Sequence, residues 1–255
     1  MKKRLATWAL AALSVGLVAG TAHAGKIVVA NDEWTLSNSG FSGLNDAGQF
    51  AQNVASWFNN GSTGGNFLAY SGNFGLTGTN LSSSITGAGH SWTVSTAVTF
   101  DLATLSAYDG IFLAGNFADN QVLIDYVNNG GNVYLAAGTG WGGAAAEASQ
   151  WNTFLNAFGL GLGSFYNGVG GSIAISSAHP IFANVDHLYQ DNGNNTLDVD
   201  ALDSRGTVLV SLPTSGYGLY AVYESLSAPV PEPGTMLLFG TGLAGLAAYG
   251  RRRTA

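Results

Sequence analysis

The sequence predicts an α/β domain built as a three-layer sandwich, in which helices cover both faces of a mostly parallel sheet. Short apolar runs alternate with amphipathic helical patterns from residue 26 to residue 158. Such alternation is typical of parallel strands joined by right-handed helical crossovers. Both ends of the chain are instead apolar and basic, which separates them from the body. We expect an N-terminal signal peptide at one end and a single C-terminal transmembrane segment at the other.

The N-terminus has the pattern of a secretory signal peptide. Basic residues 2–4 precede an apolar run, and small residues at 22 and 24 predict cleavage between Ala24 and Gly25. A permanent membrane helix would need roughly 20 uninterrupted apolar residues, and Thr21 and His23 interrupt this run. We therefore expect four segments: signal peptide 1–24, an α/β domain 25–226, a Pro-rich linker 227–234, and a transmembrane segment with a basic tail 235–255.

The body is acidic and contains no cysteine. Between residues 25 and 227 the basic residues are Lys26 and Arg205, against fourteen Asp and Glu. Nucleic acid and anionic lipid surfaces would repel such a body. The lack of cysteine excludes thiol catalysis, thiolate metal sites and iron–sulfur clusters. We expect no cofactor.

Local patterns predict the elements of the body. Strands are expected at 26–30, 67–70, 108–116 and 132–137, and amphipathic helices at 44–58, after an N-cap at Asp119, and at 148–158. The segment 71–89 is rich in Gly, Ser, Thr and Asn, so we expect a loop. Short β-like runs at 172–175, 207–210 and 218–223 suggest the far edge of the sheet, with antiparallel pairing.

Residues that follow the predicted strands form a candidate ligand site. In open α/β sheets, ligands bind beyond the carboxyl ends of the strands. This rule brings together Asp32, Glu33, Trp34, Asn116, Thr139 and Trp141. Two carboxylates, an amide and two indoles suit a sugar, but they also suit a structural role in which the indoles cover the sheet. Adjacent Asp32 and Glu33 face opposite sides of an extended strand and make a poor acid/base pair.

An oxygen-rich segment at 191–203 offers a weak candidate for Ca²⁺, with Asp191, Asp198 and Asp200 as ligands. It does not fit the EF-hand loop, because Gly193 occupies the third position and no Glu closes the loop. A solvated loop explains the same composition. We therefore expect no metal site.

Two phrases of the body resemble a known superfamily. "YDGIFLAGNFADNQVLIDYVNNGGNVYLAAGTGWGG" and the later "AHPIFANVDHLY" resemble class I glutamine amidotransferase-like proteins, and more closely their trehalose-utilisation (ThuA-like) branch. The resemblance implies a flavodoxin-like α/β core. In amidases of this superfamily a cysteine stands at a G-x-C-x-G turn, whereas the matching position here is Gly140. His179 is followed by Pro180 and not by the x-Glu of the amidase pair, so a glutaminase is excluded.

The C-terminus resembles the PEP-CTERM sorting signal. Val230, Pro231, Glu232 and Pro233 precede a sixteen-residue apolar run, 235–250, and a basic cluster of Arg251, Arg252 and Arg253. The run is short of the roughly 20 residues of a comfortable membrane span. The resemblance implies a Gram-negative bacterium that makes exopolysaccharide, transient anchoring in the inner membrane after Sec export, and cleavage by an exosortase-type protease. The body would then reach the cell surface or extracellular matrix.

Three functions remain open from the sequence. The first is a non-enzymatic surface or biofilm-matrix protein, with a degenerate amidotransferase-like domain that binds exopolysaccharide. The second is an exported carbohydrate-active hydrolase or isomerase of ThuA-like type that uses crevice carboxylates. The third is a purely structural matrix component without a ligand.

Overall fold

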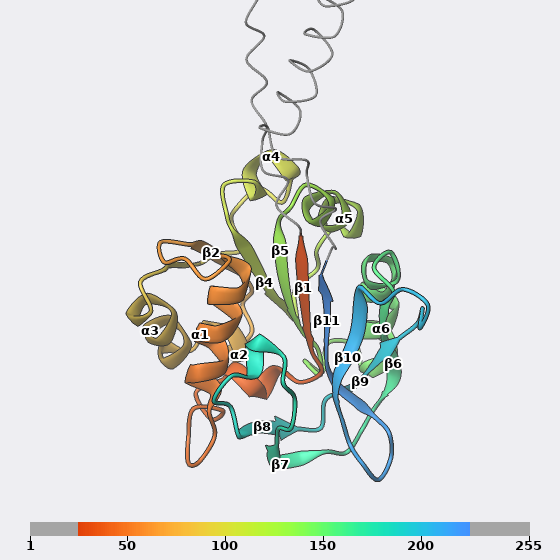
Figure 1. Cartoon of the computed structure of the whole chain (residues 1–255). Helices are drawn as coiled ribbons and strands as arrows, with labels where there is room; N and C mark the ends of the chain where they lie inside the picture. Colours follow the sequence, from red (N-terminus) through yellow and green to blue (C-terminus); the bar gives the residue numbers. More distant parts are fainter. Residues whose placement is uncertain (1–24, 225–255) are drawn as a thin grey trace, which may run out of the picture. The chain divides into compact units, whose positions relative to one another are not determined.

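A nine-stranded mixed sheet forms the centre of the structure, a computed structural model that describes residues 25–224 (Figure 1). The predicted signal peptide and the predicted sorting tail lie outside the described residues. Within residues 25–224, no helix combines the length and the apolar character needed to cross a membrane.

Five neighbouring strands of this sheet are parallel. Their order is β3 (Ser91–Val94), β2 (Asn66–Tyr70), β4 (Gly110–Ala114), β5 (Asn132–Ala136) and β1 (Lys26–Ala30). All residues of β1, β4 and β5 are buried. This burial on both faces explains their continuous apolar sequences. The strands predicted at 26–30, 67–70, 108–116 and 132–137 are thus confirmed.

The last third of the chain adds antiparallel strands to the sheet. β11 (Gly218–Glu224) pairs with β1. β9 (Asn194–Asp198) and β10 (Gly206–Ser211) both pair with β11, and β6 (Leu160–Tyr166) pairs with β9. The antiparallel pairing was predicted, but the far-edge position was wrong for the run 218–223. β11 lies beside β1 inside the sheet, because six of its seven residues are apolar or small and buried. The run at 172–175 gives β7 (Gly170–Ala174), which pairs with β8 (His187–Asp191) in a separate two-stranded sheet.

The strand order differs from the flavodoxin-like order 2-1-3-4-5. In that order the first strand lies between the second and third strands, whereas here β1 lies between β5 and β11. Strands β2 to β5 do keep the relative order of the first four flavodoxin strands, and β1 occupies the fifth place. A fully buried apolar strand fits any inner position, so its local sequence could not determine this placement.

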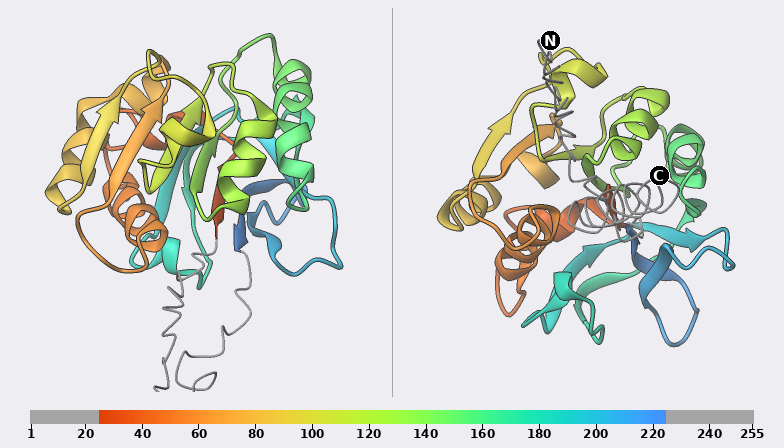
Figure 2. Two further views of the ribbon diagram at one scale, coloured as in Figure 1. Left: turned by 90° about the horizontal axis from the view of Figure 1, so that it is seen from above. Right: turned by 45° about the horizontal axis from the view of Figure 1, so that its top comes forward.

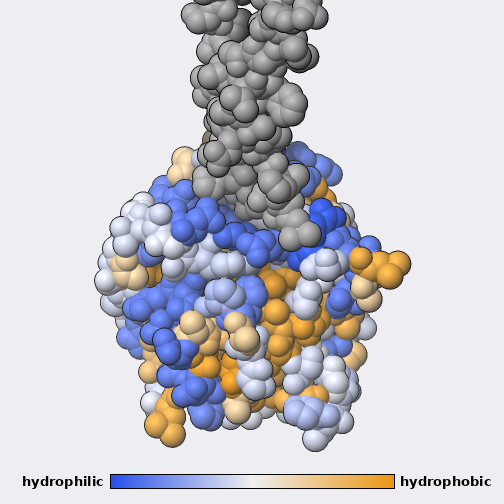
Figure 3. Space-filling view, viewed as in Figure 1, coloured by the Kyte–Doolittle hydropathy of each residue, from blue (hydrophilic) through white to orange (hydrophobic). Residues whose placement is uncertain are grey.

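Helices cover both faces of the sheet, as the sequence predicted (Figure 2). Side chains of β1 alternate: Val28 packs with α1 (Ala47–Phe58), and Ile27 packs with α5 (Asn120–Asn128) and α6 (Ala144–Asn156). An aromatic stack reinforces the first core, with the Tyr134 and Phe112 ring centroids 5.0 Å apart. On the face shown in Figure 3, hydrophobic side chains remain visible near the centre. Leu209 and Leu212 are among the partly buried residues that pack against the first core.

Helix α5 begins at the N-cap that the sequence predicted. The Asp119 carboxylate accepts hydrogen bonds from the amides of Gln121 (2.8 Å) and Val122 (3.2 Å), which confirms it as the N-cap of α5. Gly130 follows the helix with a φ of +93°. Residues other than glycine rarely adopt this conformation, so the helix ends there.

The loop predicted at 71–89 is wrong, since this segment forms α2 (Phe74–Thr77) and α3 (Thr79–Gly87). Its Ser, Thr, Asn and Gly residues are weak helix formers, which explains why composition alone predicted a loop. Leu81 and Ile85, four residues apart on α3, are fully buried against the core. Tertiary burial of this one face outweighs the weak local propensity. Short helix α4 (Leu102–Leu105) precedes β4.

Candidate functional site

The loops after four parallel strands meet at one edge of the sheet, which we call the carboxyl edge. β1, β2, β4 and β5 all end there, and the loops that follow them supply polar and aromatic side chains. The six residues predicted to form a ligand site lie in three of these loops. The structure divides them into buried structural groups and exposed groups.

Asp32 belongs to the buried group. Its side chain is fully buried, and its carboxylate accepts hydrogen bonds from the amides of Trp34 (2.8 Å) and Asp191 (2.6 Å). It thereby caps the short helix η1 (Glu33–Leu36) and ties it to the end of β8. Burial raises the pKa of Asp32 to about 6, against the lowering by these amides. Asp32 therefore stabilises the fold and is not exposed at the carboxyl edge.

Glu33 is the first buried carboxylate at the carboxyl edge. It is 6% exposed, and Oε2 accepts a hydrogen bond from the side-chain amide of Asn73 in the loop after β2. Burial is the main cause that raises the pKa of Glu33 to about 7, and the negative charges of Asp32 and Glu147 add to it. A carboxyl group in this state exchanges its proton near neutral pH.

Glu147 is the second carboxylate, and the sequence prediction missed it. It lies in the first turn of α6, and its carboxylate accepts hydrogen bonds from the amides of Gly138 (3.1 Å) and Thr139 (2.9 Å) and from the Thr139 hydroxyl. Burial raises its pKa, although these hydrogen bonds lower it. Glu147 is the only charged residue between Asp125 and Asp186. That isolation beside a glycine turn was the available signal.

Gly115 separates the residues that hold the two carboxylates. A Cβ at Gly115 would lie 3.2 Å from Nδ2 of Asn73 and 3.6 Å from Cβ of Thr139. Since Asn73 donates to Glu33 and Thr139 donates to Glu147, the hydrogen-bond partners of both acids lie next to Gly115. The φ of Gly115 is +65°, so a larger residue would be strained as well as crowded.

Asn116 and Tyr166 add two further polar side chains at the carboxyl edge. Oδ1 of Asn116 accepts a hydrogen bond from the Gly72 amide at 2.8 Å, which joins the loops after β2 and β4. The Tyr166 hydroxyl, at the end of β6, is shielded from solvent. Burial, followed by the charges of Glu147 and Glu33, raises the pKa of Tyr166. The buried Tyr166 hydroxyl thus lies close to both carboxylates and to the Gly140 backbone.

Aromatic side chains surround these polar groups. Trp34 contacts the Phe74 ring edge-on, at a centroid distance of 4.7 Å. Exposed aromatic residues follow β2, β4 and β5 and stand near the end of β6: they are Phe74, Phe117, Trp141 and Phe165, each 43–67% exposed. Large exposed rings in several neighbouring loops provide flat surfaces for a ligand.

The glycine turn between β5 and α6 occupies the place predicted for a nucleophile elbow. Gly140 has a φ of +71°, and a Cβ there would meet nothing within 4 Å. The position is therefore open but carries no reactive side chain. His179 lies elsewhere, as the N-cap of η2 (Pro180–Phe182), with its ring 5.1 Å from that of Trp57.

The acidic segment 191–203 is not one loop, because its residues 194–198 form β9. Asp198 and Asp200 each accept a hydrogen bond from the amide two residues later, and Asp203 binds Arg205. Within residues 25–224, no three His, Cys, Asp or Glu side chains group closely enough to hold a metal ion. The weak Ca²⁺ candidate Asp191, Asp198 and Asp200 thus gains no support.

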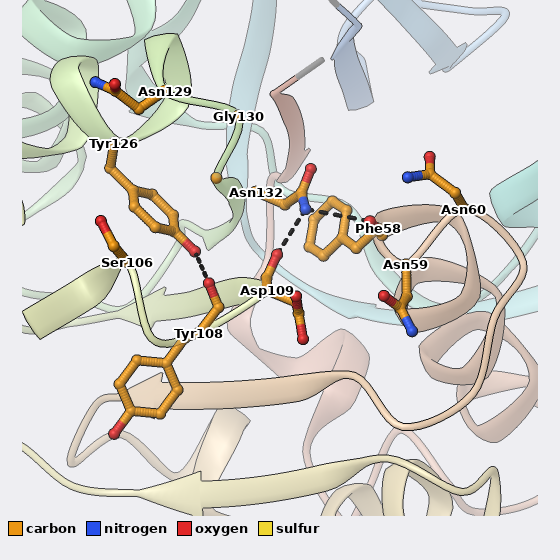
Figure 4. Close-up of a pocket in the computed structure, with 11 residues that line it drawn as sticks. Phe58, Asn59, Asn60, Ser106, Tyr108, Asp109, Tyr126, Asn129, Gly130 and Asn132 are labelled. Atoms are coloured by element: carbon orange, nitrogen blue, oxygen red, sulfur yellow. Dashed lines mark hydrogen bonds between the residues drawn. The ribbon is translucent and has the colours of Figure 1, made fainter. Parts of the chain in front are cut away.

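A polar cavity of about 200 Å³ lies at the opposite, amino edge of the parallel strands (Figure 4). Several of its polar groups already hold the backbone together. The Asn132 side chain donates to the carbonyls of Phe58 and Asp109, and the Tyr126 hydroxyl donates to the Tyr108 carbonyl. These groups stabilise the starts of β4 and β5, so the carboxyl edge is the better candidate for ligand binding.

Comparison with protein families identifies a PEP-CTERM protein-sorting motif at residues 229–253. The motif supports an exported protein that an exosortase processes and sorts to the cell surface. No curated protein and no solved structure matches the chain. The amidotransferase-like resemblance of the body therefore rests on its sequence phrases alone.

Proposed function

We propose that this PEP-CTERM protein is a non-enzymatic component of the cell surface or extracellular matrix that binds exopolysaccharide at its carboxyl edge. Export through the Sec machinery and transient anchoring in the inner membrane would precede cleavage by the exosortase. The observation that carries the binding proposal is the set of exposed aromatic rings at the carboxyl edge, which lie near the buried carboxyl groups of Glu33 and Glu147.

The chemistry of this combination suits a sugar polymer. Sugar rings present hydroxyl groups at their edges and C–H groups on their faces. Carboxylates and amides accept and donate hydrogen bonds to the edges, and aromatic rings such as Trp141 stack on the faces. Phe117 and Trp141 lie in the loops after β4 and β5, Phe74 begins α2 and Phe165 lies in β6, so one extended sugar chain can contact rings from several elements.

We also propose that the body is a catalytically degenerate relative of amidotransferase-like proteins. Two features support this proposal: the turn between β5 and α6 has glycine at the nucleophile position, Gly140, and strands β2 to β5 keep part of the flavodoxin-like order. The thiol that an amidase needs is absent from the chain. We therefore expect the carboxyl edge to bind a ligand without catalysing a reaction.

The binding proposal can be tested with exopolysaccharide isolated from the producing cells. Trp141→Ala, in the full-length protein, should reduce polysaccharide retention about tenfold, because a stacking platform contributes about 1–2 kcal/mol. Trp141 is 45% exposed, so its removal should leave the melting temperature unchanged. Retention equal to that of the unchanged protein would favour a purely structural matrix component.

Tyr108→Ala provides a matched control, since Tyr108 is an aromatic residue at the amino-edge cavity. Its side chain lies at the opposite end of the parallel strands, so retention should remain unchanged. Loss of retention in Tyr108→Ala, with none in Trp141→Ala, would move the site to the amino edge.

A carbohydrate-active hydrolase or isomerase is the second candidate, and the approach of Glu33 and Glu147 favours it. Two carboxyl groups in unequal environments can serve as acid and base. The sequence suggested Asp32 and Glu33, but Asp32 is committed to backbone amides. If the unchanged protein produces new reducing ends or isomerised sugars from the polymer, and neither Glu33→Gln nor Glu147→Gln does, the protein is an enzyme. If the unchanged protein forms no such products, enzymatic activity on that polymer is excluded.

A further inference from the structure

Strand β3 forms one end of the large sheet and pairs on one side only, with β2 (Figure 2). Its residues are mostly exposed, and Val94 is 45% exposed. A strand at a sheet edge presents unpaired main-chain groups to any further strand.

The hydrogen bonds to β2 identify which groups of β3 face outward. The amides of Ser91 and Ser95 donate to the carbonyls of Gly65 (2.8 Å) and Ala69 (3.1 Å). Because main-chain groups alternate in direction along a strand, the N–H and C=O groups of Trp92 and Val94 point away from β2. The outer edge therefore presents two residues ready for an antiparallel partner.

This edge is short, but it lacks the charges, prolines and bulges that protect most edge strands against pairing. Residues 91–100 contain no charged residue, no proline and no glycine, and most are β-branched, aromatic or hydroxylated. Natural edge strands carry charges, prolines or bulges that prevent association. The pairing of β3 with β2 is regular, whereas β6, at the other end of the sheet, has an irregular register between Leu162 and Tyr166.

The charge distribution indicates what can approach this edge. Residues 47–100, which form α1, β2, α2, α3 and β3, contain no Asp, Glu, Lys or Arg. The fourteen acidic residues of the body all lie in other segments. Two copies of this acidic body repel each other in most orientations. With their β3 ends facing, the two segments that meet contain no Asp, Glu, Lys or Arg of their own, so a second copy of the chain fits this surface.

We propose that two copies of this protein pair antiparallel through β3, about a two-fold axis at Thr93. Trp92 of each copy then lies opposite Val94 of the other, and each such pair exchanges two main-chain hydrogen bonds. The two Thr93 residues lie opposite each other as a non-hydrogen-bonded pair. The result is one continuous sheet across both bodies.

The pairing also bears on the proposed polysaccharide binding, and this consequence rests on that proposed function. Antiparallel pairing directs the carboxyl edges of the two copies toward opposite sides of the joined sheet. The dimer then has two crevices that face apart, which allows it to bridge two polysaccharide chains. A four-residue strand buries little area, so we expect weak pairing that becomes effective when copies are crowded on a surface.

A cysteine placed at the axis tests the pairing directly, because the natural chain has no cysteine. In a non-hydrogen-bonded antiparallel pair the Cα atoms lie about 4.5 Å apart, which a disulfide can span. Full-length Thr93→Cys, oxidised mildly on intact cells, should give a dimer on a non-reducing gel. Ser83→Cys, exposed on the neighbouring helix α3, should stay at least tenfold less cross-linked. Equal cross-linking of the two variants would overturn the proposal.

A charge at the same position provides the complementary test. Thr93→Lys places two like charges opposite each other, so light scattering at high protein concentration should show a dimer for the unchanged full-length chain and a monomer for this variant. Ser83→Lys adds the same charge on α3 and should remain dimeric. A dimer that persists in Thr93→Lys, or a monomer for the unchanged chain at high concentration, would contradict the β3 interface. Polysaccharide retention by the monomeric Thr93→Lys variant separates this inference from the binding proposal, because a single crevice should still bind.

Discussion

Asp32 is a residue type common in functional sites, and it follows a strand end where ligands often bind, yet its role here is structural. Its carboxylate holds the amides of Trp34 and Asp191 in the protein interior. Asp32→Ala leaves these buried donors without an acceptor, and we expect it to lower the free energy of unfolding by about 2–4 kcal/mol. Urea denaturation measures this loss. Asp198→Ala, an exposed carboxylate at the end of β9, is the control and should change stability by less than about 0.5 kcal/mol.

The buried carboxyl groups also predict how stability depends on pH. Burial raises the pKa of Asp32 from 3.8 to about 6 and that of Glu33 from 4.5 to about 7, and it raises the pKa of Glu147. Between these ordinary values and the raised ones, the folded state binds more protons than the unfolded state. Stability must therefore fall as the pH rises from about 4 to about 7.

Urea denaturation at pH 5 and pH 8 measures this dependence, and the protein should be more stable at pH 5. Glu33→Gln combined with Glu147→Gln removes two of the responsible groups, so the difference between the two pH values should shrink. A protein that is more stable at pH 8 than at pH 5 would show that the acidic groups are not buried as described.

At this scale the sequence predicted part of the candidate site. Proximity to strand ends identified Glu33, Asn116 and Thr139, because the carboxyl ends of parallel strands share one edge. Glu147 and Tyr166 were missed, since a helix and a later antiparallel strand bring them to that edge. The position of Tyr166 depends on how distant segments pack, which no local pattern encodes, whereas Glu147 binds the nearby Gly138 and Thr139 and had a local signal.

Among the elements, α3 has the weakest local signal, and its stability depends on two buried side chains. We expect Leu81→Ala to lower the free energy of unfolding by about 2–5 kcal/mol, because it removes a fully buried side chain from the core. Ser83→Ala, on the exposed side of the same helix, should have almost no effect. Guanidinium denaturation of both variants makes the comparison. Similar stability for Leu81→Ala and the unchanged protein would support the loop that composition alone suggested.

The elements with strong periodicity were predictable, and their arrangement was not. The apolar runs of β1, β4 and β5, and the cap of α5, carry their own signals in a few neighbouring residues. The position of β1 between β5 and β11 depends instead on pairing with residues about 100 and 190 positions away. Such a register is chosen by the whole core, and buried apolar strands are interchangeable in local sequence.

At the scale of the whole molecule, the chain completes its sheet with its last described strand. β11 pairs with β1 over five residues and also with β10 and β9, so it joins the parallel and antiparallel parts of the sheet. The sorting motif begins at residue 229, shortly after Glu224 at the end of β11. Cleavage within the motif would therefore spare every strand described.

This arrangement predicts different outcomes for two truncations of the mature chain. A chain that ends at Ser227 retains β11 and should unfold cooperatively, with a free energy within about 0.5 kcal/mol of that of the full-length body. A chain that ends at Tyr217 leaves one side of β1 unpaired and exposes the apolar partners of Tyr220 and Val222, so it should not fold. Near-ultraviolet circular dichroism with urea denaturation distinguishes the two. A cooperative transition in the shorter chain would show that the sheet is complete without its last strand; an unfolded longer chain would show that the body depends on its tail, which a protein released by cleavage could not tolerate.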